Sequence, residues 1–187
     1  MNYHNLACWG DSQTFGARTY GCYPLHLAAK LNAASRYTWR TLNYSTNGHC
    51  ARDLWLRMAG ILPSLTDVYQ SCVLIGTNDV GNESPVELFG EYYRQILDAL
   101  VIAGMRAIFC GEIPPIIADG HPFFPRNSAT GRDKYNEAIE SAVQACSIAR
   151  LVRFADLDES CYVDSVHFSE IGNERVAAAY ATSILEL

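Results

Sequence analysis

The chain has 187 residues, of which 49% are hydrophobic and 18% are charged, as in an ordinary globular domain. It carries 14 basic and 20 acidic residues, so its formal net charge is -6. Nucleic acids and anionic membranes bind clustered Lys and Arg, so this balance gives no support to either partner. At this length we expect one domain, residues 1–187.

Short apolar runs alternate with segments of helical spacing along the chain. The runs predict strands at 5–9, 39–43, 71–75, 106–110 and 151–154, and the helical segments are 24–31, 51–62, 85–103, 133–148 and 169–185. The helix at 85–103 is the clearest, with Pro85 placed to open it and Ser84 to cap it. Five alternations predict an α/β fold, a three-layer α/β/α sandwich with a five-stranded parallel sheet.

Candidate site residues follow four of the predicted strands. Ser12 follows the first strand, Gly48 the second, Asn78 the third, and Asp164 and His167 the fifth. Ligands of open parallel sheets bind at the carboxyl ends of the strands, so we expect these residues at one edge. Each alone is commoner as a turn or cap residue. Their joint occurrence favours a catalytic site with a hydroxyl, an imidazole and a carboxylate.

These residues resemble the sequence blocks of the SGNH hydrolases, also called GDSL-type lipases and esterases. The matching blocks, in family order, are Gly10-Asp11-Ser12, Asn47-Gly48, Gly76-Thr77-Asn78-Asp79 and Asp164-Ser165-Val166-His167. The resemblance implies a flavodoxin-like architecture. Gln13 is a departure, because the family's name has Leu there. The G-x-S-x-G elbow of α/β-hydrolases is absent, since Thr14 stands where its second Gly would be.

The resemblance also implies a role for each residue. Ser12 would be the nucleophile, His167 the base and Asp164 the carboxylate that orients the imidazole. The backbone N–H groups of Ser12 and Gly48 and the side-chain amide of Asn78 would form the oxyanion hole. The implied reaction is hydrolysis of a small-molecule carboxylic ester or thioester through an acyl-enzyme, with no metal and no cofactor.

Two other functions stay open at this point. The same machinery would serve an O-deacetylase of an acetylated carbohydrate or other polar substrate. Alternatively, the residues only shape turns in a non-enzymatic, flavodoxin-like ligand-binding domain.

Other residues are weaker candidates for a role in the site. Cys50 beside His49 is a second candidate nucleophile with its base. The irregular stretch at 111–130 serves either function or surface packing, and its His121, Arg126 and Asn127 are candidate substrate contacts. The sequence assigns no substrate-binding residues and no oligomeric state.

Cysteine usage and the N-terminus indicate a cellular location. The first five residues show no secretory signal, and no apolar segment reaches the roughly 18 residues of a membrane span, so we expect a cytoplasmic protein. Among seven cysteines, Cys8, Cys72 and Cys110 lie in or beside apolar runs, which favours buried reduced thiols over disulfides. No CxxC pair is present to hold a structural zinc ion.

Overall fold

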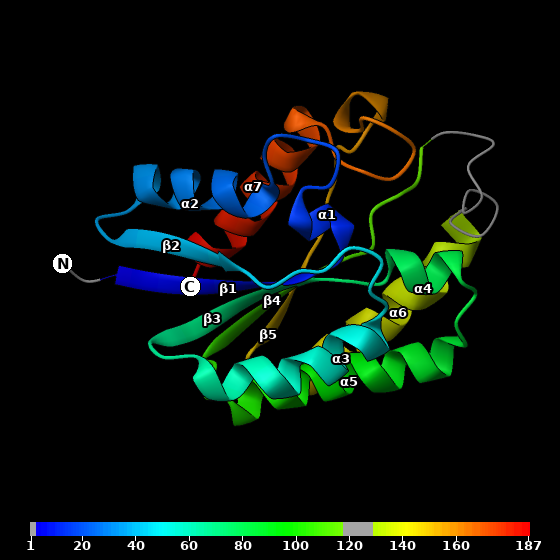
Figure 1. The fold of residues 1–187 in the computed structure, drawn as a ribbon, viewed down its shortest axis with the longest axis horizontal. Coiled ribbons are helices and arrows are strands. Elements are labelled where there is room, and N and C mark those ends of the chain that lie inside the picture. Colours follow the sequence, from blue (N-terminus) through cyan, green and yellow to red (C-terminus); the bar gives the residue numbers. More distant parts are fainter. Residues whose placement is uncertain (1–2, 118–128) are drawn as a thin grey trace.

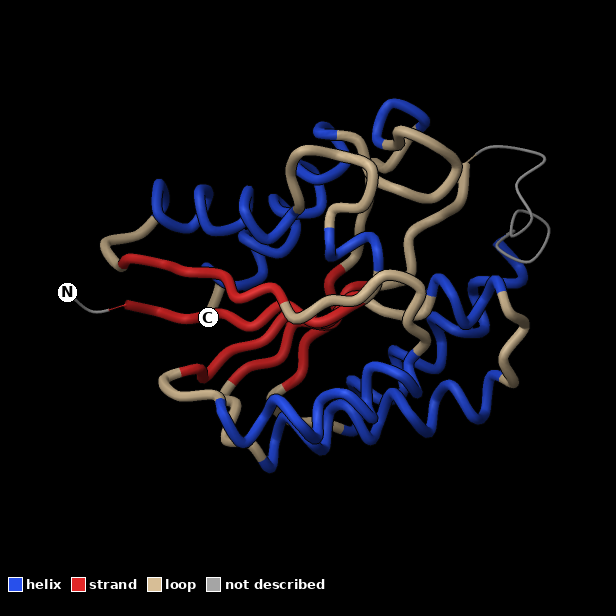
Figure 2. Tube along the Cα trace, in the orientation of Figure 1, coloured by secondary structure: helices blue, strands red, loops and turns tan. Residues whose placement is uncertain are grey.

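The computed structural model describes residues 3–117 and 129–187. At its centre is a sheet of five parallel strands in the order β2-β1-β3-β4-β5 (Figure 2). The strands are β1 (Tyr3–Gly10), β2 (Thr38–Asn43), β3 (Val68–Leu74), β4 (Ala107–Gly111) and β5 (Ala149–Val152). The predicted five-stranded parallel sheet is confirmed.

Helices cover both faces of the sheet, which confirms the three-layer sandwich (Figure 1). One layer holds α2 (Tyr23–Ala34) and α7 (Glu170–Leu185), and the other holds α3 (Ala51–Ile61), α5 (Val86–Ile102) and α6 (Ala129–Ala145). The shorter elements are α1 (Ser12–Phe15), η1 (Leu62–Ser64), α4 (Thr77–Gly81) and η2 (Glu159–Cys161). None of the helices in the described ranges is long and apolar enough to cross a membrane.

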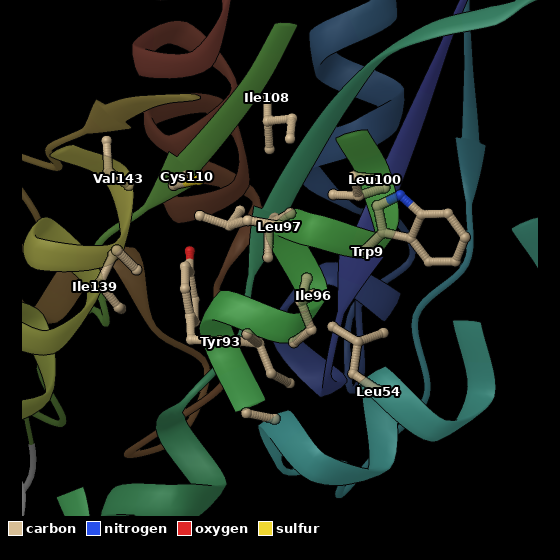
Figure 3. Close-up of a cluster of buried hydrophobic side chains, with 14 of the residues drawn as sticks. Trp9, Leu54, Tyr93, Ile96, Leu97, Leu100, Ile108, Cys110, Ile139 and Val143 are labelled. Carbon is tan, nitrogen blue, oxygen red and sulfur yellow. The ribbon is translucent and has the colours of Figure 1, made fainter. Parts of the chain in front are cut away.

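The core forms because successive strand side chains point to opposite faces. In β1, Leu6 and Cys8 pack toward α2 and α7, whereas Ala7 and Trp9 pack toward α3 and α5. Figure 3 shows Trp9 in this second cluster, together with Leu54, Ile96 and Leu97 from the covering helices. Helices bury both faces, which explains why the central strands read as continuous apolar runs.

The ends of several elements differ from the sequence prediction. β5 lies two residues earlier than predicted, where it pairs with β4 from Ile108 to Gly111. Helix α6 begins at Ala129, earlier than the predicted 133. Pro85 is the N-cap of α5 with an extended ψ of 128°, so the helix starts at Val86 and the expected capping by Ser84 is wrong. The seven cysteines are free thiols, as predicted, with Cys8, Cys72 and Cys110 buried.

The strand order reverses between β1 and β3. From β1 the chain goes to β2 on one side, and it then returns to β3 on the other side. Helices α1 and α4 start directly after β1 and β3, at the carboxyl ends of these strands (Figure 1). Ligands of open α/β sheets bind at such a switch point, so this edge is where a site is expected.

Candidate active site

Ser12 opens helix α1 at the carboxyl end of β1. Asp11 caps this helix, because its Oδ1 accepts the backbone N–H of Gln13 at 2.9 Å. Gly10 leaves no room for a side chain, since a Cβ there would collide with the carbonyl oxygen of Leu74 and the hydroxyl of Thr14. The turn is therefore tight and places a half-buried serine at the sheet edge.

Asp164 and His167 form a carboxylate–imidazole pair on the loop before α7. Oδ2 of Asp164 lies 2.9 Å from Nδ1 of His167. Oδ1 of Asp164 accepts the backbone N–H groups of Val166 and His167, both at 2.8 Å. Burial alone would raise the pKa of Asp164, but the hydrogen bonds from His167 and Val166 outweigh it and lower this pKa to about 2. At neutral pH the carboxylate is charged and favours the tautomer with a proton on Nδ1, which leaves Nε2 free to accept one.

Arg18 adds a cation to this pair. Its guanidinium lies 3.0 Å from Oδ2 of Asp164, and its side chain is 69% exposed. The backbone of Arg18 has a φ of 66°, in the left-handed region that non-glycine residues seldom adopt. Sequence reasoning missed this contact, because no pattern relates a residue after the first strand to one near the end of the chain.

Gln13 connects two segments that are distant in sequence. One is the stretch after β1, residues 11–18, called here the Ser12 turn; the other is the loop between η2 and α7, residues 162–169, called here the His167 loop. Its Nε2 donates to the carbonyl oxygen of Val166 at 2.9 Å, and its Oε1 accepts the hydroxyl of Thr77 at 3.1 Å. The first, third and fifth sequence blocks therefore meet at one edge, as predicted. Within residues 3–117 and 129–187, the hydrogen bonds of the His167 ring go to Asp164, and none joins the ring to the Ser12 hydroxyl. Such contacts are often long in free enzymes and tighten when substrate binds.

The second block lies beside the third. Gly48, in the loop after β2, has a φ of 78°, and no atom lies within 4 Å of where its Cβ would be. This left-handed conformation favours glycine. The open space beside Gly48 would also let a ligand approach its backbone closely. Nδ2 of Asn78 donates to the carbonyl oxygen of His49 at 2.9 Å and makes a longer contact of 3.5 Å with Oδ2 of Asp11.

Two buried carboxyl groups support this arrangement. Burial raises the pKa of Asp11 to about 7, with a further contribution from the nearby charge of Asp79. Burial likewise raises the pKa of Asp79 to about 7, although Asp79 accepts the backbone N–H of Ala51 at 2.9 Å. That bond ties the start of α3 to α4, so these carboxyl groups have structural partners distinct from the Asp164–His167 pair.

One protein-family model matches most of the chain and shows its family. The model of the GDSL-like Lipase/Acylhydrolase family matches residues 8–175. The chain belongs to this family. It is thus a carboxylic ester hydrolase of the SGNH/GDSL type, which sets aside the non-enzymatic ligand-binding alternative. No curated protein matches the chain.

Solved structures of similar fold include several esterases. A lipase/acylhydrolase from Enterococcus faecalis has a TM-score of 0.78 at 17% identity, over 97% of this chain and 95% of its own. An aryl esterase from M. smegmatis has a TM-score of 0.78 at 15% identity, over 98% and 99%. A carbohydrate acetylesterase from Sinorhizobium meliloti has a TM-score of 0.76 at 14% identity, over 98% and 99%. At these identities the similarity shows the shared fold.

The properties of Cys50 do not support it as the nucleophile of this GDSL-family protein. Burial raises the pKa of Cys50 to about 11, so its thiol is neutral at pH 7 and a poor nucleophile. Burial also lowers the pKa of His49. The candidate substrate contacts His121, Arg126 and Asn127 lie outside the described residues. Within the described ranges, no group of three or more His, Cys, Asp or Glu side chains could hold a metal ion.

Proposed function

We propose that this GDSL-family protein is a serine hydrolase that cleaves a carboxylic ester or thioester through an acyl-enzyme. Ser12 attacks the carbonyl carbon, and His167 accepts the hydroxyl proton and returns it to the leaving group. Asp164 holds the imidazole and stabilises its protonated form. Water activated by His167 then attacks the acyl group, releases the acid and regenerates Ser12.

One observation carries this proposal. The Asp164–His167 pair, with 2.9 Å between Oδ2 and Nδ1, stands on a loop that is hydrogen-bonded to the residue after Ser12. A base, its orienting acid and a hydroxyl from the other end of the chain thus share the switch point of the sheet. This proximity supports nucleophilic catalysis by Ser12, with His167 as its base once substrate brings the two side chains into contact.

The oxyanion hole belongs to the same proposal. The backbone N–H groups of Ser12 and Gly48 and the side-chain amide of Asn78 are the proposed donors. One N–H of Asn78 is bonded to the carbonyl oxygen of His49, and its other contact, to Asp11, is long at 3.5 Å. A developing oxyanion would compete well for that second N–H, and one such donor contributes about 10²- to 10³-fold in rate.

An O-deacetylase of an acetylated carbohydrate is the second candidate. It is favoured by the solved acetylesterase structure from Sinorhizobium meliloti, which this chain matches over 98% of its length and 99% of the other. The chemistry would be the same, and only the pocket around the acyl and alcohol groups would differ. Assays with p-nitrophenyl esters of increasing acyl length, run beside acetylated sugars, separate the two candidates.

We also infer that residues 1–187 form one catalytic domain and that the protein works in a reducing compartment such as the cytoplasm. The support for the compartment is that the cysteines are free thiols, several of them in the core.

Replacement of Ser12 by Ala tests the proposed nucleophile. We expect Ser12→Ala to lose turnover of a short p-nitrophenyl ester and labelling by a fluorophosphonate probe. Ser64→Ala is the matched control, because Ser64 is an exposed serine in η1 whose hydroxyl donates to the nearby carbonyl oxygen of Ile61. Unchanged turnover in the Ser12 variant would refute the proposal.

A further inference from the structure

Gln13 places a buried amide between segments that carry the proposed catalytic groups. Gln13 is only 2% exposed, although glutamine is usually found at the surface. Nε2 donates to the carbonyl oxygen of Val166, the residue before His167, at 2.9 Å. Oε1 accepts the hydroxyl of Thr77, the residue before Asn78, at 3.1 Å. Gln13 itself follows Ser12, so each end of the amide is bonded next to a different group of the proposed site.

These two bonds make Gln13 different from the leucine in the family's name. A leucine would fill a similar volume but would leave the carbonyl oxygen of Val166 and the hydroxyl of Thr77 without this partner. A buried polar group without a partner is costly, so the amide is favourable only where both bonds form. The pair of bonds therefore fixes the His167 loop at one distance from α1.

An ion pair between Arg18 and Asp164 also joins the Ser12 turn to the His167 loop, but it is weaker. Arg18 pairs with Asp164 at 3.0 Å, but its side chain is 69% exposed. Exposed ion pairs contribute little to stability because water screens them and long side chains lose freedom. The buried amide is therefore a firmer connection between the Ser12 turn and the His167 loop than this ion pair.

We propose that Gln13 is a positioning residue, which holds the His167 loop in register with Ser12 while Thr77 completes the connection. The inference rests on the proposed roles of Ser12 and His167. Gln13 does not touch the reacting atoms. It sets the separation of the nucleophile and its base, and a misplacement of about 1 Å between reacting groups can cost about 10²-fold in rate.

Three substitutions separate this role from simple packing. Gln13→Met keeps an unbranched side chain of similar length and removes both hydrogen bonds. Thr77→Val keeps the shape and removes one bond, whereas Thr77→Ser retains the hydroxyl. Gln95→Met is the matched control, because Gln95 lies on α5 and bonds to Glu91 on the same helix.

We expect Gln13→Met to lower kcat by about 10- to 100-fold with little change in KM, because positioning acts on the transition state. Thr77→Val should lower kcat by a smaller factor, and Thr77→Ser, which keeps the hydroxyl, should have nearly the original kcat. The double variant Gln13→Met/Thr77→Val should lose less than the product of the single effects, since both remove the same bond. Gln95→Met should leave kcat unchanged.

The rate of fluorophosphonate labelling at Ser12 provides the deciding measurement, because it needs no knowledge of the natural substrate. It is compared for samples of equal folded fraction, checked by near-ultraviolet circular dichroism and thermal unfolding. Slower labelling of folded Gln13→Met and Thr77→Val, with a labelling rate near the original in Thr77→Ser, supports the inference. A merely structural role would lower Tm and leave the labelling rate of folded protein intact.

The outcomes also distinguish the inference from the proposed function. If the original protein is labelled at Ser12 and folded Gln13→Met is labelled at the same rate, the positioning role is wrong and the proposed function stands. If the original protein is not labelled at Ser12, the proposed function fails, and this inference fails with it. Should Gln13→Met not fold, Thr77→Val decides, and an unchanged labelling rate there overturns the inference.

Discussion

Replacing Asp164 with Asn removes a charge and keeps the size of the side chain that contacts Nδ1 of His167. The amide oxygen of Asn can still accept the N–H groups that Oδ1 of Asp164 now accepts at 2.8 Å. Its NH₂ group would then stand where Oδ2 lies 2.9 Å from Nδ1 of His167. Because this group donates, Nδ1 must become the acceptor and the ring proton moves to Nε2. The imidazole could then no longer take the proton of Ser12, as the proposed mechanism requires.

The expected loss is large for the rate and small for stability. A wrong tautomer in a serine triad lowers kcat by about 10⁴-fold, which is about 5.4 kcal/mol of activation free energy. The pKa of Asp164 is lowered from 3.8 to about 2, so its charge adds at most about 2 kcal/mol to the free energy of unfolding. This pKa is depressed in the folded state, so the contribution is present above about pH 4 and is lost as the pH falls through about 2. The Asn variant should stay folded at neutral pH.

The assay measures kcat on a short p-nitrophenyl ester at about pH 7.5. At this pH the carboxyl group of Asp164 in the original protein is ionised. Asp158→Asn is the matched control, because Asp158 caps η2 by accepting the N–H of Ser160 at 2.9 Å and pairs with Arg175 at 3.1 Å. The control should retain full kcat. A folded Asp164→Asn protein with kcat within about tenfold of the original would refute the role of Asp164 in the tautomer argument.

Three further predictions concern backbone and burial. Gly48→Ala should lower the free energy of unfolding by about 1 kcal/mol and lower kcat as well. Gly104→Ala is its control, because Gly104 has a similar φ of 86° and similarly open surroundings; it should lose similar stability and keep kcat unchanged. Gly60→Ala, in α3 with no atom within 4 Å of its Cβ, should raise the free energy of unfolding in urea by about 0.5–1 kcal/mol. The pKa of Asp79 is raised from 3.8 to about 7 in the folded state, so its stability contribution is lost as the pH rises from about 4 through 7. Asp79→Asn should therefore show a smaller fall in Tm between pH 5 and 8, and an equal fall would contradict the assigned burial effect.

The fold could be predicted from the sequence because its signals are local. Residues Leu6 to Trp9 are all apolar since helices bury both faces of β1, and an uninterrupted apolar run of this length indicates a central strand. The ends of elements were less predictable. β5 begins at Ala149 because it pairs with Ile108 of β4, and such pairing partners are not visible in a single run of residues.

For the candidate site, the sequence by itself determined which groups are available and where they leave the sheet. Asp164 and His167 are three residues apart, so one loop suffices to bring the carboxylate to 2.9 Å from the ring. Only the tertiary structure decided how distant segments meet. Gln13 reaches Val166 across 153 positions, and a glutamine beside Ser12 shows nothing of its partners until the packed layers fix both segments at the same edge. Hydrogen bonds of this kind depend on positions set by the whole core, so their geometry is a property of the fold and not of the residues alone.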